Sequence, residues 1–223
     1  MKIIGHIETD FATKFGLPRQ SGLCDELCGR IVLAPEYRRE EAFRGLEGFS
    51  HIWLLWLFSQ AEREDWSATV RPPRLGGNKR VGVFATRSPF RPNNIGLSCV
   101  KLDRIDYSEA ESPVLYVSGI DMMNGTPIVD IKPYVPVADC RPEASDGFTL
   151  QTKDYSLCVE FAENLLCMLP ADKQKGAVQM LSQDPRPSYI DDEERIFGVE
   201  YAEYDIRFRV CKDKLIVVDV IKL

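Results

Sequence analysis

Three segments combine polar side chains with residues that fix a turn, and each could hold part of a ligand. Residues 16–23 place Pro18, Arg19 and Gln20 between two glycines. Residues 86–97 read Thr-Arg-Ser-Pro-Phe-Arg-Pro-Asn-Asn-Ile-Gly-Leu, and residues 121–127 read Asp-Met-Met-Asn-Gly-Thr-Pro. Backbone amides in such turns bind the polar edge of a ligand, and arginine adds planar donors. The same segments would also serve as tight corners of a barrel, and spacing alone favours that interpretation.

Several common chemistries have no motif in this chain. No G-x-G-x-x-G follows a strand-like run and no Walker A loop is present, so neither a Rossmann-type site nor phosphoryl transfer is indicated. Cys24 and Cys28 have no second pair at zinc-ligand spacing, and we expect no metal site. A hydrolase with Cys99 or Cys140 as nucleophile is disfavoured, because neither histidine stands at a persuasive spacing.

Charge is unevenly distributed along the sequence. The net charge is −6, yet residues 67–102 contain no Asp or Glu. The basic residues of this segment are Arg71, Arg74, Lys79, Arg80, Arg87, Arg91 and Lys101. A concentrated basic segment focuses positive potential where a phosphate or polyanion docks. On charge alone, ion pairs with carboxylates from other segments would explain it equally well.

The composition is typical of a globular intracellular protein. Hydrophobic residues make up 44% and charged residues 28% of the 223 residues. The longest apolar run, Ile52–Phe58, is far too short to cross a bilayer. His6, Glu8 and Asp10 stand where a signal peptide would need an apolar core, and seven cysteines without an export signal indicate reduced thiols. We therefore expect a cytoplasmic protein with no membrane span.

Short strand-like runs dominate residues 1 to about 140. They are bounded by Gly, Pro and polar clusters, and they are Ile3–Ile7, Arg30–Leu33, His51–Phe58, Val81–Ala85, Leu97–Tyr107, Val114–Ile120 and Ile128–Val137. One helix is predicted from Pro35 to Leu46, because proline stands at its start and good helix formers follow. Many short strands with long connections favour a closed or partly closed barrel.

The pattern changes after a Gly-, Pro-, Ser- and Asp-containing segment at residues 141–147, which indicates a linker. From Cys158 to Leu169, apolar residues recur at helical spacing and predict an amphipathic helix. A second helix is predicted over Ala171–Ser182. The second part of the chain is therefore expected to contain helices as well as strands.

The C-terminal end of the chain has the pattern of a hairpin. Asp205–Val210 alternates with period two, and a polar turn leads into Leu215–Ile221. We therefore expect a mainly β protein, in which an N-terminal β-barrel (residues 1–140, not a Rossmann sheet) precedes a small α+β C-terminal domain (residues 141–223).

The sequence resembles the TrmO family of S-adenosylmethionine-dependent tRNA methyltransferases. The resemblance covers nearly the whole chain, strongly to about residue 140 and more thinly beyond. The matching segments are Pro18–Gln20, Arg44–Trp53, Val70–Asn78, Val81–Ser88, Phe90–Asn93, Asn124–Pro127, Asp130–Tyr134 and Gln183–Pro187. Several long motifs in the same order make the resemblance specific.

The resemblance implies a barrel, a homodimer with S-adenosyl-L-methionine near the subunit interface, and N6-methylation of threonylcarbamoyladenosine beside the anticodon of threonine-type tRNA. It implies that the methyl donor contacts Pro18, Arg19, Gln20, Ser59, Gln60, Arg87, Leu97, Met122, Met123, Asn124 and Gly125. Asn124 departs from the family, which often has Asp there; Asn keeps the turn but loses the negative charge. We therefore expect the departure at Asn124 to affect the affinity for the methyl donor more than the class of reaction. The barrel would bind the donor and catalyse, and the C-terminal domain would assist tRNA binding.

Methyl transfer from a sulfonium is an in-line displacement, so the main task is to align the donor with the nucleophile. The target nitrogen is urea-like and a poor nucleophile, so loss of its proton must be assisted. We predict Asp130 as a base, with Tyr134 or Asn93 as orienting groups. An ordinary ion pair between Asp130 and Lys132 is at least as good an interpretation of that position.

Phosphates of the tRNA anticodon stem-loop are predicted to contact six basic residues. These are Arg71, Arg74, Lys79, Arg80, Arg91 and Arg186. Phe90 could stack on an unpaired base, although a core position is its more ordinary role. The alternative function is a non-catalytic S-adenosylmethionine- or RNA-binding regulatory module.

Overall fold

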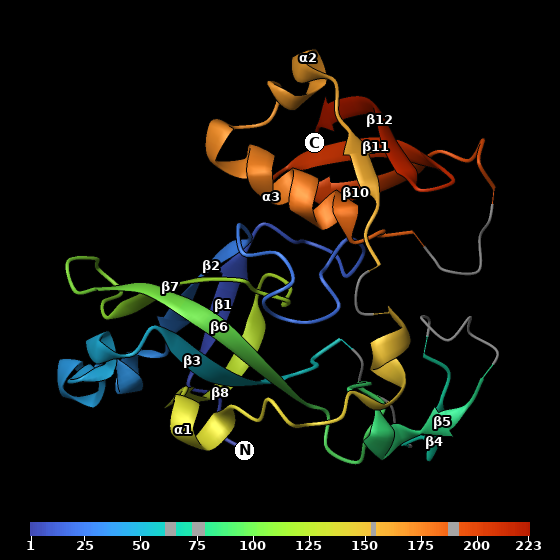
Figure 1. Cartoon of the computed structure of the whole chain (residues 1–223). Coiled ribbons are helices and arrows are strands. Elements are labelled where there is room, and N and C mark those ends of the chain that lie inside the picture. Colours follow the sequence, from blue (N-terminus) through green and yellow to red (C-terminus); the bar gives the residue numbers. More distant parts are fainter. Residues whose placement is uncertain (61–65, 73–78, 153–154, 187–191) are drawn as a thin grey trace.

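The structure is a computed structural model of the chain that describes residues 1–60, 66–72, 79–152, 155–186 and 192–223, with only the backbone of residues 151–152. A β-barrel occupies one part of the molecule and a smaller unit of sheet and helices the other (Figure 1). This arrangement confirms the predicted fold class: mainly β, with a barrel followed by a small α+β part.

Six strands close the barrel in the order β1-β2-β7-β6-β3-β8, and neighbouring strands run antiparallel. Their bounds are β1 Gly5–Thr9, β2 Cys28–Leu33, β3 His51–Leu57, β6 Ile95–Asp106, β7 Val114–Ser118 and β8 Thr126–Pro133. β1 closes the barrel because it pairs with β2 on one side and β8 on the other. Alternate side chains point inward along each strand, as Ile52, Leu54 and Trp56 of β3 do.

The helix predicted over Pro35–Leu46 is wrong. The segment instead forms three short 3-10 turns, η1 Pro35–Tyr37, η2 Glu40–Phe43 and η3 Leu46–Gly48. Arg39 is extended between the first two turns, and Gly45 takes a positive φ of 91° before the third. Phe43 is the single buried residue of these turns, so there is no apolar stripe to stabilise a continuous helix.

The amphipathic helix predicted over Cys158–Leu169 is also wrong. Its first residues form strand β9, Cys158–Glu160, and only Glu163–Leu166 forms a helix, α2. β9 pairs in parallel with strand β12 from the end of the chain, and this long-range pairing outweighs the local helical pattern. Leu165 and Leu166 still pack against the core, which explains the apolar spacing.

Two predicted strands of the first part end early. Val81–Ala85 forms strand β5 over Val81–Gly82 only, paired with β4 Thr69–Val70, and then the 3-10 turn η5, Val83–Ala85. The run predicted from Ile128 to Val137 leaves the sheet at Pro133, because proline has no N–H for the ladder. A short helix, α1 Pro136–Asp139, follows.

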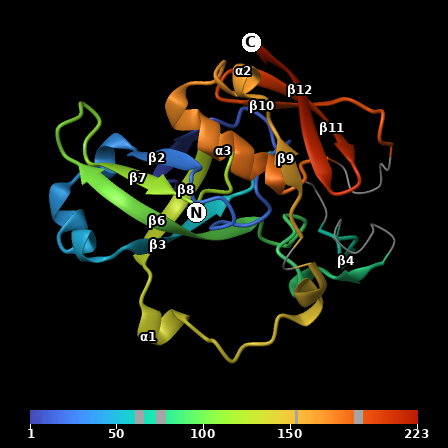
Figure 2. The ribbon, with the colours of Figure 1, turned by 45° about the horizontal axis from the view of Figure 1, so that its top comes forward.

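The C-terminal unit contains the predicted helix α3, Ala171–Ser182, and a four-stranded sheet in the order β10-β11-β12-β9. β11 Tyr204–Cys211 and β12 Lys214–Lys222 form the predicted terminal hairpin. β10 Phe197–Tyr201 and β4 were not predicted, and a 3-10 helix, η6, spans Gly147–Thr152. α3 lies on the side of this sheet that faces the barrel (Figures 1 and 2).

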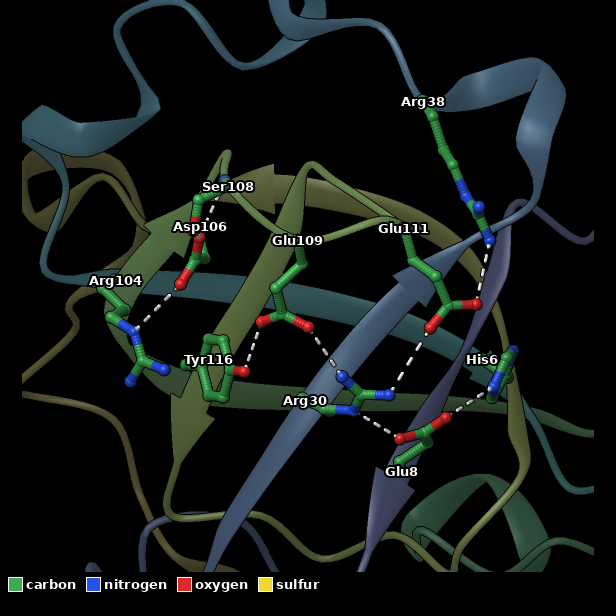
Figure 3. Close-up of polar contacts among 10 residues, drawn as sticks. All are labelled: His6, Glu8, Arg30, Arg38, Arg104, Asp106, Ser108, Glu109, Glu111 and Tyr116. Atoms are coloured by element: carbon green, nitrogen blue, oxygen red, sulfur yellow. Dashed lines mark hydrogen bonds and ion pairs between the residues drawn. The ribbon is translucent and has the colours of Figure 1, made fainter.

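A charged network covers the outer surface of β1, β2 and β7 (Figure 3). Arg30 of β2 donates to Glu8 of β1, and its other nitrogens reach Glu109 at 2.9 Å and Glu111 at 3.5 Å. The Glu8 pKa is lowered, chiefly by the hydrogen bond from Arg30. Tyr116 of β7 donates to the same Glu109. The network therefore ties the β6–β7 connection to the strands that close the barrel.

No helix among the described ranges has both the length and the apolar character needed to span a bilayer.

The barrel interior predicts a large effect of Gly96→Ala. A Cβ at Gly96 would overlap the indole ring of Trp56, which faces it across the β3–β6 pair. Because the ring is buried inside the barrel, we expect destabilisation of about 1–3 kcal/mol in urea unfolding. Gly82→Ala is the control, since its Cβ would meet nothing within 4 Å. Equal urea midpoints for the two variants would contradict this packing.

Candidate functional site

Four connecting segments meet at one end of the barrel. The antiparallel registers Gly29 with Thr9, Ile7 with Thr126, and Leu57 with Ile95 bring together the same ends of their strands. The segments at this end are residues 10–27, 58–60, 83–94 and 119–125. All three turn segments singled out in the sequence therefore lie at this end.

Gln20 and Arg87 make the direct contact between the first two segments. An Nη1 hydrogen of Arg87 is donated to the amide oxygen of Gln20, and the Gln20 amide nitrogen donates to the Arg19 carbonyl at 2.6 Å. Next to them, the Ser21 hydroxyl accepts the Cys99 backbone N–H at 3.1 Å. This bond holds the loop along β6, where the Leu97 side chain is 46% exposed. An amide, a guanidinium and an apolar surface thus lie together.

A polar chain of three residues runs from the barrel interior to the connection between β7 and β8 at this end. The buried Trp56 indole N–H donates to the Ser98 hydroxyl at 2.9 Å, and Ser98 donates to an Asp121 carboxylate oxygen at 2.6 Å. Burial raises the pKa of Asp121, and the Ser98 and Ser21 hydrogen bonds and the nearby Arg87 charge oppose the rise. Ser98 occupies an inward position of β6 where apolar residues otherwise stand.

Sequence reasoning did not select this polar chain. Asp121 belonged to a recognised turn segment, but its buried environment depends on β3 and β6. A serine at an inward position of an apolar strand was the one signal available, and only the strand register shows that it is inward.

The 122–125 turn is fastened to β1. Asn124 Oδ1 accepts the Thr9 N–H at 3.2 Å, and the Met122 carbonyl accepts the Thr9 hydroxyl at 3.2 Å. Gly125 has a φ of +76°, which favours glycine, and its N–H donates to the Ile7 carbonyl at 2.8 Å. Met122 is buried in the core and Met123 is half-buried, so Asn124 and Gly125 are the most exposed residues of the turn.

The remaining positions implied for the donor differ in exposure. Pro18 is buried, Arg19 is exposed, and Ser59 and Gln60 are exposed directly after β3. The Ser59 N–H donates to the Leu57 carbonyl at 2.9 Å, and the neighbouring Phe58 exchanges hydrogen bonds with Asn94. These residues all lie at the same barrel end, where the Gln20–Arg87 bond joins two of the segments through their side chains.

The predicted catalytic residues are not in mutual contact. Asp130 points outward from β8 and forms an ion pair with Lys132 at 2.9 Å, as its ordinary interpretation predicted. Tyr134 lies at the far end of β8, with ring contacts to His51 and Trp53 at centroid distances of 6.3 and 5.8 Å. Burial raises the Tyr134 pKa. Asn93 is exposed just before β6, at the barrel end that carries the four segments.

The predicted phosphate contacts fall into two groups. Arg71, Lys79 and Arg80 are exposed around the β4–β5 hairpin, and Arg80 donates to the Thr69 hydroxyl at 2.9 Å. Arg74 lies outside the described residues. Around these three, the surface presents positive charge toward solvent.

The second group is engaged in intramolecular contacts. Arg91 donates to the carbonyls of Val83 at 3.2 Å and Thr86 at 2.6 Å. Arg186 donates to Asp184 at 3.0 Å and is largely buried with it. Phe90 is half-buried, and its carbonyl accepts the Ser67 N–H at 3.3 Å. Arg91 and Arg186 therefore stabilise the fold through these intramolecular contacts.

The C-terminal unit holds the loop that carries Gln20. The rings of Phe11 and Tyr201 pack at 5.3 Å, and Lys173 of α3 forms an ion pair with Asp10 at 2.6 Å. Further along the loop, the Glu26 N–H donates to the side chain of Gln179 at 3.0 Å. The loop of residues 10–27 is thus fixed from both sides, by the barrel and by α3 and β10.

Among the residues that the structure describes, no group of three or more His, Cys, Asp or Glu side chains could hold a metal ion.

Family models match both parts of the chain. The tRNA-methyltransferase O N-terminal domain matches residues 6–140, and the TrmO C-terminal domain matches residues 156–223. The chain belongs to the TrmO family. This confirms the resemblance drawn from the motifs.

Curated relatives and solved structures agree with the assignment to the TrmO family. The chain is 41% identical to the tRNA (adenine(37)-N6)-methyltransferase of Escherichia coli, over 93% of this chain and 91% of that protein. It is 41% identical to the putative S-adenosylmethionine-dependent methyltransferase RcsF of Pseudomonas aeruginosa, over 97% of this chain and 95% of that protein. A crystal structure of P. aeruginosa TrmO superimposes with a TM-score of 0.80 at 35% identity, covering 99% of this chain and 95% of the other.

The burial of Asp121 predicts a pH-dependent stability. Because the pKa is raised in the folded state, the protonated carboxyl stabilises the fold below its ordinary value of 3.8, and this contribution is lost as pH rises through the folded pKa. The measurement is urea unfolding between pH 3.5 and 7, a range of about three to four pH units that lies mostly above the ordinary pKa of 3.8. Asp121→Asn has no carboxyl at this position and should not lose stability in this way as pH rises. The stability of the wild type relative to the variant should therefore fall with rising pH.

Asp106→Asn is the matched control for this measurement. The half-buried Asp106 accepts two hydrogen bonds from Ser108, which lower its pKa, so its contribution is lost as pH falls. The two difference profiles should slope in opposite directions. A flat profile for Asp121→Asn would refute the burial of a titrating carboxyl at this position.

Proposed function

We propose that this member of the TrmO family is an S-adenosyl-L-methionine-dependent methyltransferase that N6-methylates threonylcarbamoyladenosine next to the anticodon of threonine-type tRNAs. The single observation that carries the proposal is the Gln20–Arg87 contact, which joins two motif segments 67 residues apart. The names of the E. coli and P. aeruginosa relatives, a tRNA (adenine(37)-N6)-methyltransferase and a putative S-adenosylmethionine-dependent methyltransferase, support the tRNA substrate and the methyl donor. A cytoplasmic location is part of the same proposal, because tRNA is the substrate.

The residues at this barrel end fit the donor. Arg87 and Gln20 offer hydrogen-bond donors of the kind that a carboxylate or an adenine edge accepts, and the exposed Leu97 offers apolar surface. The exposed Asn124 and Gly125 add backbone polar groups and an amide. When bound, the donor supplies an electrophilic methyl group on its sulfonium.

The chain's own residues would align the nucleophile and manage its proton. We propose Asn93, exposed at the donor end of the barrel, as an orienting group for the modified adenosine. Asp130 and Leu97 stand in one row across β8, β3 and β6 through Leu55, and both point outward. This places Asp130 about 10 Å from Leu97, two strand spacings away. Asp130 as base and Tyr134 as orienting group remain proposals on that same outer face.

We also propose a homodimer that uses the outer face of β3, β6 and β8. Outward positions of β3 and β6 carry Leu55, Leu57, Ile95 and Leu97, and β8 adds the outward Asp130–Lys132 ion pair beside them. The opposite wall of the barrel carries the Arg30 network instead. Because one wall is charged and satisfied while the other presents aliphatic side chains, the aliphatic wall suits a second copy of the chain. The donor contacts at Leu97 would then lie near the subunit interface.

Leu97→Glu should separate the proposed dimer. A carboxylate placed in an apolar interface loses hydration without gaining a partner, so the molar mass in light scattering should fall from twice that of the chain toward the 25.3 kDa monomer. Met168→Glu is the control, because Met168 in the C-terminal unit is also 46% exposed. A monomeric wild type, or a variant that remains dimeric, would contradict this interface.

The reaction is tested by nucleoside mass spectrometry of tRNA incubated with the protein and S-adenosylmethionine. One tRNA pool bears threonylcarbamoyladenosine and the other is unmodified. Addition of one methyl mass in the modified pool alone is the expected result. Methylation of both pools would retain the methyltransferase and remove the substrate assignment. No methylation in either pool, together with measurable donor binding, would favour the non-catalytic binding module.

Substitutions at Arg87 and Arg80 should separate donor binding from tRNA binding. Arg87→Ala should raise the Kd for the methyl donor roughly tenfold or more, because the proposed charge-assisted hydrogen bond from the guanidinium to the methyl donor is lost. The same substitution removes the contact that holds Gln20. Arg80→Ala should leave donor affinity unchanged, weaken tRNA binding and reduce the salt slope of binding by about one. Arg104→Ala, at an exposed arginine on the charged wall of the barrel, is the control. Wild-type methylation and binding by both variants would refute these assignments.

The roles of the two parts of the chain follow from the same proposal. We propose that residues 1–140 bind the donor and catalyse, and that residues 141–223 assist tRNA binding. The contacts of Lys173 and Tyr201 with the segment that precedes Gln20 support an additional supporting role for the C-terminal part at the donor loop.

A further inference from the structure

Two large aromatic side chains are exposed side by side on the β4–β5 hairpin. Trp66 is 50% exposed and Phe84 is 70% exposed, and their rings stack with centroids 6.0 Å apart and an interplanar angle of 27°. An exposed apolar pair of this size costs solvation free energy unless a ligand covers it. The hairpin stands beside the barrel rather than within its wall, so the barrel sheet leaves this pair uncovered (Figures 1 and 2).

Backbone hydrogen bonds fix the two rings next to each other. The Val83 N–H donates to the Ala68 carbonyl at 3.0 Å, and the Ser67 N–H donates to the Phe90 carbonyl at 3.3 Å. These bonds extend the ladder in which Thr69 pairs with Gly82 and Val70 pairs with Val81. The stacking pair is therefore a product of the hairpin backbone and is present without a ligand.

One cation lies against the aromatic pair, and others stand at the opposite end of the β4–β5 ladder. The Arg91 guanidinium lies over the Phe84 ring, 5.6 Å from its centroid. Arg80 donates to the Thr69 hydroxyl on the neighbouring strand, and Arg71 is exposed just after it. The sequence from Ser67 to Leu102 contains no carboxylate. The acidic residues Glu62, Glu64 and Asp65 precede Trp66 and lie outside the described residues.

The aromatic pair and the donor contact share one turn. Phe84 stands three residues before Arg87, and the Thr86 hydroxyl donates back to the Val83 carbonyl at 2.8 Å. Arg91 donates to the carbonyls of Val83 and Thr86, so it fastens the turn that carries both Phe84 and Arg87. A ligand stacked on Phe84 is thus held at a fixed position relative to Arg87.

We propose that Trp66 and Phe84 form a stacking platform for an unpaired nucleobase of the RNA substrate, and that Arg91 is the positioning residue of this platform. The inference rests on the proposed function for its RNA and adds the surface that receives the base. Aromatic faces combined with nearby cations are the combination that binds single-stranded nucleic acid, because each base has a π face and each nucleotide a phosphate. Arg71, Lys79 and Arg80 supply the cations toward solvent. The platform replaces Phe90 as the base-stacking aromatic, since Phe90 is half-buried.

Tryptophan fluorescence of the full chain tests the platform directly. The chain has three tryptophans, of which Trp56 is buried and Trp53 half-buried. Stacking of a base on Trp66 should quench the emission when an anticodon stem-loop RNA is added. Trp66→Ala and Phe84→Ala should each weaken RNA binding about tenfold, within the range known for loss of a stacked base, with no change in donor affinity.

Trp66→Phe provides the decisive comparison, because phenylalanine keeps a stacking face and removes the fluorophore. This variant should bind RNA within about threefold of wild type and lose most of the quenching. Phe49→Ala is the control, at an exposed ring beyond the far end of β3, and it should bind and quench as wild type. Full quenching in Trp66→Phe, or wild-type affinity in both alanine variants, would overturn the proposal.

Two further readouts separate the platform from its alternatives. A lower molar mass of Trp66→Ala in light scattering, with unchanged RNA affinity, would make the pair a contact between copies of the chain and overturn the proposal. If the wild type does not methylate tRNA but binds RNA more tightly than Trp66→Ala does, the result would support the platform and remove the proposed reaction. Methyl transfer by both alanine variants at wild-type RNA affinity would support the reaction and remove the platform.

Discussion

The loop of residues 10–27 joins the barrel to the C-terminal unit, and its path sets the position of Gln20. The loop follows β1 at one end of the barrel. Its first residues are held by the Phe11–Tyr201 ring contact and the Asp10–Lys173 ion pair. Its central glycine, Gly16, has a φ of +91° and lies against Val199 and Met180, where any side chain would collide. The loop therefore cannot take its path unless both the barrel and the C-terminal unit are folded. Gln20, and with it the contact to Arg87, inherits that dependence.

The polar chain from Trp56 through Ser98 to Asp121 links the barrel interior to the same loop. Its two hydrogen bonds, at 2.9 and 2.6 Å, give each donor one acceptor, so the buried Ser98 hydroxyl and the largely desolvated Asp121 carboxylate are both satisfied. The Ser21 backbone approaches Asp121 from the loop side. Gly96 leaves room for the Trp56 ring, and this packing fixes the indole N–H that donates to Ser98. Core packing and the position of the proposed donor loop are thus not independent in this molecule.

The outer wall of the barrel divides into surfaces with different chemistry. On β1, β2 and β7, Arg30 hydrogen-bonds to three carboxylates, and the guanidinium of Arg104 on the neighbouring β6 lies 3.4 Å from the centre of the Tyr116 ring (Figure 3). On β3 and β6, Leu55, Leu57, Ile95 and Leu97 stand in the outward rows, and the Asp130–Lys132 ion pair of β8 lies beside them. Beside that wall, the β4–β5 hairpin carries cations and two stacked rings. In the proposed function, the methyl donor binds at the end of the barrel, the second subunit on the outer face of β3 and β6, and the RNA at the β4–β5 hairpin. These three surfaces adjoin one another.

The sequence by itself determined the mainly β class, the barrel, α3 and the terminal hairpin, because alternation, turn residues and helical spacing are local properties. Its motifs also determined the family. The tertiary structure alone decided that Cys158–Glu160 is a strand, since that depends on pairing with β12, and that residues 35–48 form 3-10 turns. It alone assembled Gln20 with Arg87, buried Asp121 beside Ser98 and exposed Trp66 beside Phe84. Local pattern specifies which way a side chain tends to point, whereas strand register and loop packing decide which distant residue it meets.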